Sequence, residues 1–116
     1  MSRRKDEHLL DDVIESITRI QNYTQGINYQ GFREDIKTQD AVMRNIEIIG
    51  EAVRNLSSDL KDNNPTVPWK EISGTRDKLI HDYFGVNIDV VWGIIELDLP
   101  DLTDRIATIR KELSSG

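Results

Sequence analysis

Residues 38–60 read TQDAVMRNIEIIGEAVRNLSSDL, and their apolar side chains recur at alternating intervals of four and three. The recurring positions are Val42, Ile46, Ile49, Val53, Leu56 and Leu60. This spacing places all of them on one face of an α-helix, because 3.6 residues complete one turn. The pattern is the most regular in the chain. We therefore expect the segment to form one continuous helix at the centre of the core.

Helical spacing of apolar residues also predicts helices on both sides of this segment. Upstream, residues 7–25 carry an apolar face of Leu10, Val13, Ile14, Ile17, Ile20 and Tyr23 or Thr24. Downstream, Asn87 or Asp89 can cap a helix whose apolar face is Ile88, Val91, Trp92 and Ile95. Pro100 is expected to break or kink that helix. A last helix to about residue 113 then buries Leu102, Ile106, Ile109 and Leu113.

The connections between these helices are marked by turn-forming residues. Residues 26–35 contain Gly26, Asn28 and Gly31 and predict an irregular connection from which Tyr29 and Phe32 pack onto the bundle. Residues 61–68 contain two prolines and predict a loop, because the residue before a proline disfavours helix. After Pro68 we expect a short helix over residues 69–73, followed by a second helix that ends near Gly85.

No segment alternates apolar and polar residues with a period of two, and the chain shows no repeats or linkers. We therefore predict an all-α fold, an up-down antiparallel bundle of four to five helices in a single domain, residues 1–116. Four aromatic residues could lie either in the core or on a dimer face, and their pattern leaves both open. They are Tyr23, Tyr29, Trp69 and Trp92.

Composition limits the classes of function. The 116 residues include no Cys, which excludes a disulfide framework, a thiolate nucleophile and a Cys-based zinc site. The first residues lack the apolar stretch of a signal peptide, and no apolar run is long enough for a membrane span, so we expect a soluble cytoplasmic protein. A net charge of -6 argues against extended RNA binding, but is compatible with a small local cleft or a basic protein partner.

Residues 76–83, RDKLIHDY, bring together the side chains best suited to phosphate chemistry. Arg76 offers a planar fork of donors that fits a phosphate, and His81 can take or give a proton near pH 7. Tyr83 adds a hydroxyl two residues later. His81-Asp82 is a pair typical of metal-dependent phosphohydrolases, but such sites need further His ligands, and the only other histidine is His8.

The spacing of Arg76 and His81 poses a geometric problem. On one regular helix the two side chains would point about 140° apart, so they could not reach one atom. One solution is a helix that begins here, with Gly74 ending a preceding turn, Thr75 as N-cap, and Arg76 at the first position beside free amides. The other is a dimer in which the Arg of one subunit and the His of its partner share a cleft. The two solutions are compatible.

The same residues carry a resemblance to a known family. Residues 76–83, with Trp69 and Ile72 before them and Phe84-Gly85-Val86 and Trp92 after them, resemble the signature of the HEPN domain in its HepT-like branch, the ribonuclease toxins of MNT/HEPN toxin-antitoxin pairs. That pattern is Arg, a polar residue, three variable residues, His, and Tyr two positions further on. Arg76, Asp77, His81 and Tyr83 fill it without departure. The resemblance extends from the first helix through Gly50-Glu51-Ala52 to Leu99-Pro100-Asp101-Leu102.

This resemblance implies a HEPN-like bundle and metal-independent endoribonuclease activity that needs no cofactor, and the divergence of Arg76 and His81 adds the prediction of a homodimer. Arg76 and His81 would be catalytic, and Asp77, one helical turn before His81, could orient its ring. The resemblance also brings the segment of Gly50 and Glu51 close to the site. Glu51 can support Arg76 or His81, or can simply be solvated, and both readings stay open. Gly50 would let another backbone come close.

The resemblance further implies a partner. In the family, the Tyr of the motif receives AMP from a minimal nucleotidyltransferase antitoxin, so Tyr83 would be the modified residue and RNA the substrate. Adding phosphates beside Arg76 would occupy the anion site. The alternative is a non-catalytic HEPN module that binds a nucleotide or dimerises with a nucleotidyltransferase. The intact Arg76/His81 pair argues against that alternative, and the acidic charge argues for it.

Overall fold

The computed structural model describes residues 2–81 and 87–115, without the side chains of Ser2, Arg3, Arg76, Lys78, Ile80 and His81. The described residues form helices and no strand, which confirms the all-α prediction. The helices are α1 (Ser2–Thr24), α2 (Tyr29–Glu34), α3 (Ile36–Arg54), α4 (Ser58–Asn63), α5 (Trp69–His81), α6 (Ile88–Gly93), a π-helical segment η1 (Ile94–Asp98), and α7 (Leu99–Ser115).

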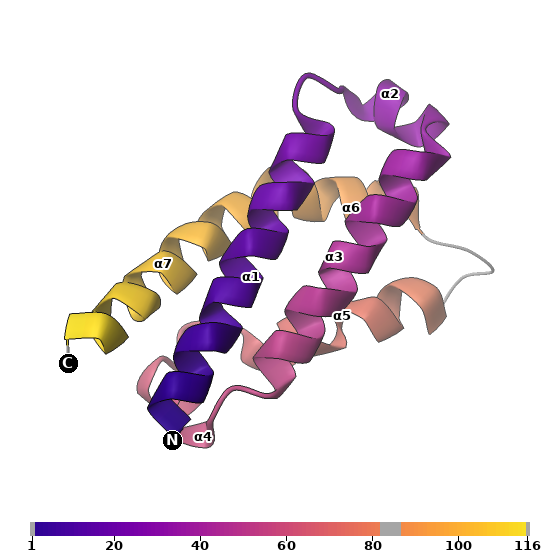
Figure 1. Cartoon of the computed structure of the whole chain (residues 1–116). Helices are drawn as coiled ribbons and strands as arrows, with labels where there is room; N and C mark the ends of the chain where they lie inside the picture. The colour runs from indigo at the N-terminus through magenta and orange to yellow at the C-terminus, as the bar shows by residue number, and fades with distance from the viewer. Residues whose placement is uncertain (1, 82–86, 116) are drawn as a thin grey trace.

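The long helices pack as an up-down bundle (Figure 1). Helix α1 lies between α3 and α7, and α3 lies between α1 and α5. The N-terminal end of α1 and the C-terminal end of α7 lie at the same end of the molecule (Figure 1). Among the described residues, no helix is both long enough and apolar enough to cross a membrane.

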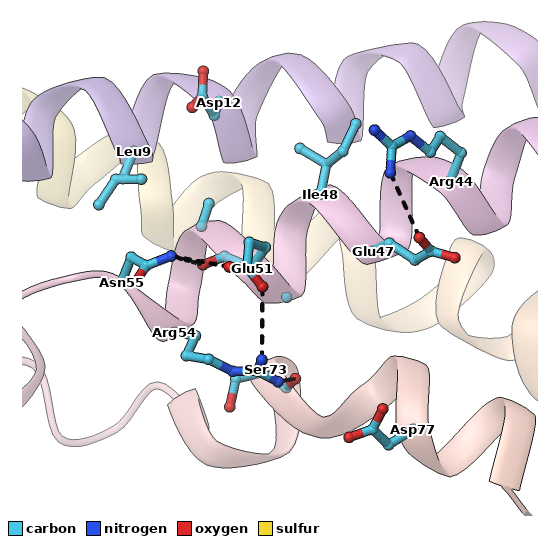
Figure 2. A pocket seen from close by; sticks show the side chains of 12 residues that line it. Leu9, Asp12, Arg44, Glu47, Ile48, Glu51, Arg54, Asn55, Ser73 and Asp77 are labelled. Carbon is cyan, nitrogen blue, oxygen red and sulfur yellow. Dashed lines mark hydrogen bonds and ion pairs between the residues drawn. The ribbon is translucent and has the colours of Figure 1, made fainter.

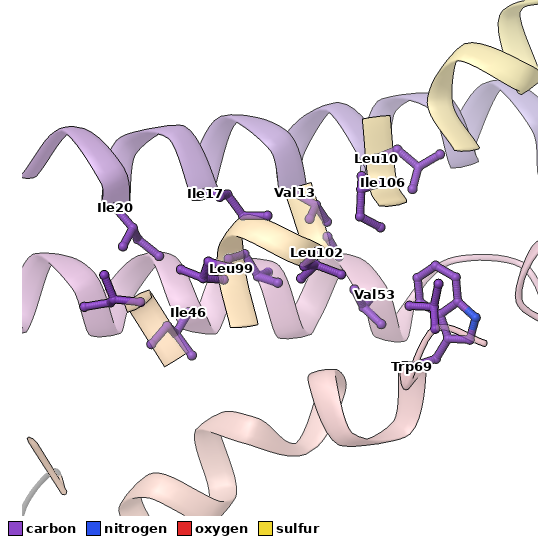
Figure 3. Close-up of a cluster of buried hydrophobic side chains, with 14 of the residues drawn as sticks. Leu10, Val13, Ile17, Ile20, Ile46, Val53, Trp69, Leu99, Leu102 and Ile106 are labelled. Carbon is purple, nitrogen blue, oxygen red and sulfur yellow. The ribbon is translucent and has the colours of Figure 1, made fainter. Parts of the chain in front are cut away.

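The core follows the predicted apolar faces (Figure 3). The stripe of α3 is buried as expected, with Val42 and Val53 fully covered and Ile46 and Ile49 each 4% exposed. Leu10, Val13, Ile17 and Ile20 of α1 and Ile106 of α7 are fully buried in the same core cluster. This packing places α3 at the centre and leaves one side of it to α5.

The prediction of one continuous helix over residues 38–60 is wrong, because this segment forms parts of two helices. Helix α3 ends at Arg54, and Ser57 caps α4 by accepting a hydrogen bond from the amide of Leu60 (3.2 Å). The Ser57 amide and hydroxyl in turn donate to the buried carboxylate of Asp6, at 2.9 and 2.6 Å. A Ser side chain can hydrogen-bond backbone groups that would otherwise pair within the helix. Here the hydrogen bonds of Ser57 to the distant Asp6 favour the break between the two helices. Leu56, within the break, and Leu60, in α4, both remain buried.

The connection over residues 26–35 is more ordered than predicted, because it contains α2. Gly26 ends the turn after α1 with a φ of 76°, and Asn28 caps α2. The expected packing of Phe32 is confirmed: it is fully buried, and its ring centroid lies 5.3 Å from that of Trp92. Tyr29 meets the same Trp92 edge-on at 6.3 Å and donates a hydrogen bond from its hydroxyl to Asp89. Helix α2 is thereby fixed to α6.

The remaining aromatic residues divide between core and surface. Trp69 is 9% exposed and donates from its indole to the carbonyl of Asn64 at 3.0 Å, so it belongs to the core. Trp92 is half-buried against the core cluster. Tyr23 is 42% exposed.

Pro100 does not break the helix that begins at Ile88. Helix continues from Ile88 to Ser115, and the irregularity appears in the turn before the proline as η1, where the Leu99 amide bonds to the carbonyl of Ile94. Pro lacks an N–H and its ring crowds the carbonyl four residues back, and a wider turn accommodates both. The predicted cap at Asn87 is confirmed by a 3.3 Å bond from the amide of Val90.

Candidate functional site

Helix α5 contains the Arg76–His81 part of the motif. The helix is continuous from Trp69 to His81, and Thr75 donates its hydroxyl back to the carbonyl of Glu71 at 2.7 Å. That bond belongs to a residue inside a helix, so the prediction of a separate helix with Thr75 as N-cap is wrong. The short helix predicted over residues 69–73 is the first part of α5. Arg76 therefore lies in mid-helix, and no free helix-end amides surround it.

A continuous α5 keeps the geometric problem that the sequence posed. Arg76 and His81 both belong to this helix, and at about 100° per residue their backbone positions lie about 140° apart around its axis. The side chains of these two residues are outside what the structure describes. Tyr83, the predicted AMP acceptor, also lies outside the described residues. A helix that begins at Arg76 is therefore excluded as the way to bring Arg76 and His81 to one atom. The dimer, which is the other way, stays a prediction.

Gly50 brings α3 into close approach with α5. A Cβ atom at this position would lie 3.3 Å from the carbonyl oxygen of Ser73 and 3.6 Å from that of Ile72. The 3.3 Å contact is tighter than a Cβ atom usually makes, so a side chain here would force the neighbouring backbone to shift by a few tenths of an ångström. The expectation that Gly50 admits another backbone is therefore confirmed, and the neighbour is the helix that carries the motif.

A groove of about 550 Å³ opens where α1, α3 and α5 meet (Figure 2). It brings together the two supporting residues predicted from sequence, Glu51 from α3 and Asp77 from α5. The other lining residues are Leu9, Asp12, Arg44, Glu47, Ile48, Gly50, Ala52, Arg54, Asn55 and Ser73. The groove therefore joins the segment around Gly50 to the motif helix.

Glu51 is held mainly by its own helix. Its carboxylate lies 3.6 Å from Arg54 Nη1 and accepts a hydrogen bond from Asn55 Nδ2 at 3.3 Å. The side chain is 66% exposed, as the solvated reading expects, and it also lines the groove beside Asp77. Both readings of Glu51 therefore remain open.

Arg54 is a groove residue that the sequence reasoning missed. Its Nη2 donates to the carbonyl of Ser73 at 3.4 Å, across the gap between α3 and α5 (Figure 2). A signal for it existed, because residues four apart lie on one face of a helix, and Arg54 follows Gly50 by four.

Among the lining residues that the structure describes, negative charge predominates. Four carboxylates line it, from Asp12, Glu47, Glu51 and Asp77, against the guanidinium groups of Arg44 and Arg54. Arg44 is paired with Glu47 at 3.6 Å. Among the described residues no three acidic or histidine side chains gather closely enough to hold a metal ion. An extended phosphate backbone would not favour this groove.

A second, apolar groove lies between α5 and the α6–α7 run. It has a volume of about 360 Å³ and is lined by α5 residues including Ile72, Gly74 and Leu79, facing Val90 and Ile94. Val90 is 39% exposed and Leu79 is 1% exposed. The motif helix therefore borders a polar groove and an apolar one.

Comparison with known proteins finds one matching family and several similar proteins. The sequence profile of the family described as ribonuclease HepT-like matches residues 13–109. A Thermococcus cleftensis protein named "Probable ribonuclease HepT" is 42% identical over 109 residues, covering 94% of this chain and 99% of its own. A candidate RNase of Methanocaldococcus jannaschii is 39% identical over 113 residues, covering 97% and 93%. A candidate RNase of Caldanaerobacter subterraneus is 42% identical over 103 residues, covering 89% and 88%. No solved structure matches the chain.

Proposed function

We propose that this chain, which belongs to the ribonuclease HepT-like family, is a metal-independent endoribonuclease. The match over residues 13–109 carries the proposal, because it spans the helix that holds Arg76 and His81. Relatives named as ribonucleases or candidate RNases support RNA as the substrate.

In the proposed reaction, a ribose 2′-hydroxyl attacks the neighbouring phosphorus atom. The 2′ oxygen gives its proton to a base as the new P–O bond forms, and the P–O5′ bond breaks as the 5′ oxygen receives a proton. The products are a 2′,3′-cyclic phosphate and a free 5′-hydroxyl. His81 moves the proton, a role worth about 10²- to 10⁴-fold, and Arg76 stabilises the charge on the phosphoryl oxygens. Asp77 orients the His81 ring.

The reaction needs Arg76 and His81 at one phosphate, and a homodimer supplies that arrangement. Two α5 helices facing each other across a two-fold axis would place the Arg of one subunit beside the His of its partner. In such a cleft two histidines meet, one as base and one as acid. The divergence of about 140° along a single α5 supports this proposal.

Regulation by a partner completes the proposed role. The chain is the toxin of a toxin-antitoxin pair, and a cognate minimal nucleotidyltransferase silences it by transferring AMP to Tyr83. The phenolic oxygen attacks the α-phosphorus of ATP, pyrophosphate leaves, and the phenol proton passes to solvent. The adduct then occupies the anion site beside Arg76.

A second candidate function is a non-catalytic module that binds a nucleotide or pairs with a nucleotidyltransferase. The net charge of -6 and the carboxylates of the groove favour it, because RNA gains little affinity from such a surface.

One experiment separates the two functions. Purified protein is incubated with RNA and EDTA, beside His81→Ala and beside His8→Ala, the matched change at the only other histidine. Cleavage by the wild type and by His8→Ala, with a cyclic phosphate end and loss in His81→Ala, is the expected result. Absence of any cleavage that depends on His81 would favour the non-catalytic module.

A further inference from the structure

The contact of α3 with α5 at Gly50 and Arg54 lies within about one turn of the motif. We propose that this contact sets the position of the motif helix, which makes Gly50 and Arg54 positioning residues for the reaction. The inference rests on the proposed nuclease function and extends it to residues that the motif does not contain. Its physical basis is a steric limit and a directed hydrogen bond that act on the same carbonyl group, that of Ser73.

The steric limit comes from Gly50. A Cβ at this position would lie 3.3 Å from the Ser73 oxygen, closer than ordinary van der Waals contact. The neighbour is backbone, so it cannot rotate away as a flexible side chain would. An alanine at position 50 must therefore displace α5 by a few tenths of an ångström, because rigid helices transmit strain.

The directed bond comes from Arg54. Its guanidinium is shared between Glu51 Oε2 at 3.6 Å on its own helix and the Ser73 carbonyl at 3.4 Å on α5. Asn55 holds the same Glu51 carboxylate from the next turn at 3.3 Å. Arg54 is 59% exposed, so the ion pair adds little stability, and its effect is on orientation.

The position of this contact along α5 gives it leverage over the motif. Arg76 and His81 lie three and eight residues beyond Ser73, about 4.5 and 12 Å along the helix axis. A shift or tilt at Ser73 therefore reaches both residues. Misplacing a catalytic group by about 1 Å can cost about 10²-fold in rate.

The chain offers a matched pair of glycine substitutions to test the steric limit. Gly50→Ala adds a methyl group against a carbonyl, whereas Gly93→Ala adds one to a helix with nothing within 4 Å. We expect Gly50→Ala to lower kcat about tenfold while KM stays within about twofold, because the groups that act only in the transition state are displaced. Gly93→Ala should keep both constants. Equal kcat values for the two variants would overturn the steric part of the proposal.

The positioning role of Arg54 is tested by removing its hydrogen-bond donors and then restoring a donor with a conservative substitution. Arg54→Met keeps the apolar stem and removes the donors, and Arg54→Lys restores one cationic donor. The control is Arg19→Met, at an exposed Arg that pairs with Glu15 (2.7 Å) on α1, outside the groove. We expect kcat to fall in Arg54→Met, to recover in part in Arg54→Lys, and to stay unchanged in Arg19→Met. A change confined to melting temperature, with kcat intact, would mean a merely structural role.

A readout independent of activity separates this proposal from the nuclease function. Amide NMR spectra should show shifted resonances for residues 73–77 in Gly50→Ala and Arg54→Met, and unshifted ones in Gly93→Ala and Arg19→Met. If the wild type does not cleave RNA, the nuclease proposal fails, and with it the catalytic meaning of these shifts. If the wild type cleaves RNA and α5 resonances do not respond to Gly50→Ala, the positioning proposal fails alone.

Discussion

Asp6 is a buried charged residue in the first helix. It is 3% exposed, and its two carboxylate oxygens accept hydrogen bonds from the amide and the hydroxyl of Ser57. Ser57 in turn caps α4, because its hydroxyl oxygen accepts a hydrogen bond from the amide of Leu60. One carboxylate thus ties the start of α1 to the break between α3 and α4, across 51 residues of sequence.

We predict that Asp6→Ala destabilises the fold by about 2 kcal/mol, because it leaves the partly buried Ser57 amide without its acceptor. Denaturant unfolding followed by circular dichroism measures the change. Asp40→Ala is the control, since that exposed residue should cost less than about 0.5 kcal/mol. Equal stability of Asp6→Ala and wild type would mean that water replaces the carboxylate.

A second prediction at this scale concerns Tyr83. Tyr83→Phe should keep the fold and most RNase activity, because only one phenolic oxygen is removed. The variant should escape silencing by a cognate nucleotidyltransferase, since no acceptor remains. Mass spectrometry after coexpression should find AMP on the wild type and none on Tyr83→Phe. The control is Tyr23→Phe, at an exposed tyrosine of α1, which should still be modified and silenced. AMP on another residue, or an inactive but folded Tyr83→Phe, would contradict the prediction.

The helices themselves depend on local caps, of which Asp35 at the start of α3 is the clearest. Its carboxylate accepts hydrogen bonds from the Thr38 amide at 3.0 Å and the Thr38 hydroxyl at 2.6 Å. These bonds, the hydroxyl foremost, lower the pKa of Asp35 below its usual value of 3.8.

This shift predicts a pH dependence of stability. Because the pKa is lower in the folded chain, the unfolded chain binds more protons here, so the stabilisation is present above about pH 4 and is lost as pH falls through the folded pKa. Asp35→Asn keeps an acceptor but removes the titration. Melting temperatures measured between about pH 6 and pH 2.5 should therefore converge for wild type and variant as the solution becomes more acidic. A constant difference across that range would contradict the assigned cause.

The whole molecule carries a net negative charge, and its motif helix places the backbone positions of Arg76 and His81 about 140° apart around the helix axis. The net charge is -6, and the described residues that line the polar groove beside α5 include more carboxylates than guanidinium groups. A shared cleft between two copies would concentrate two arginines and two histidines where one copy offers a divergent pair.

We predict a two-fold dimer at micromolar concentration, measurable by light scattering. Arg76→Ala and His81→Ala should each abolish RNA cleavage and relieve growth inhibition, with the helical circular dichroism spectrum intact. If the Arg of one subunit works with the His of its partner, mixing the two inactive variants should restore partial activity, because mixed dimers contain one intact pair. An active monomer would overturn the dimer, and loss of helix in either variant would return that residue to a structural role.

Local patterns in the sequence were sufficient to determine the helical class and the central stripe of α3. Val42, Ile46, Ile49 and Val53 face the core because their spacing matches the helical turn, and that match needs no partner. The motif on α5 stood out through its resemblance to a family signature, because residue types and spacing by themselves did not decide its role.

The tertiary structure decided what depends on residues far apart in the sequence. Helix α3 stops where Asp6 meets Ser57, α5 continues through Gly74 because packing overrides a weak local stop, and Arg54 finds Ser73 only once α3 lies against α5. Local propensities for these choices differ by about 1 kcal/mol or less, so contacts between distant segments outweigh them.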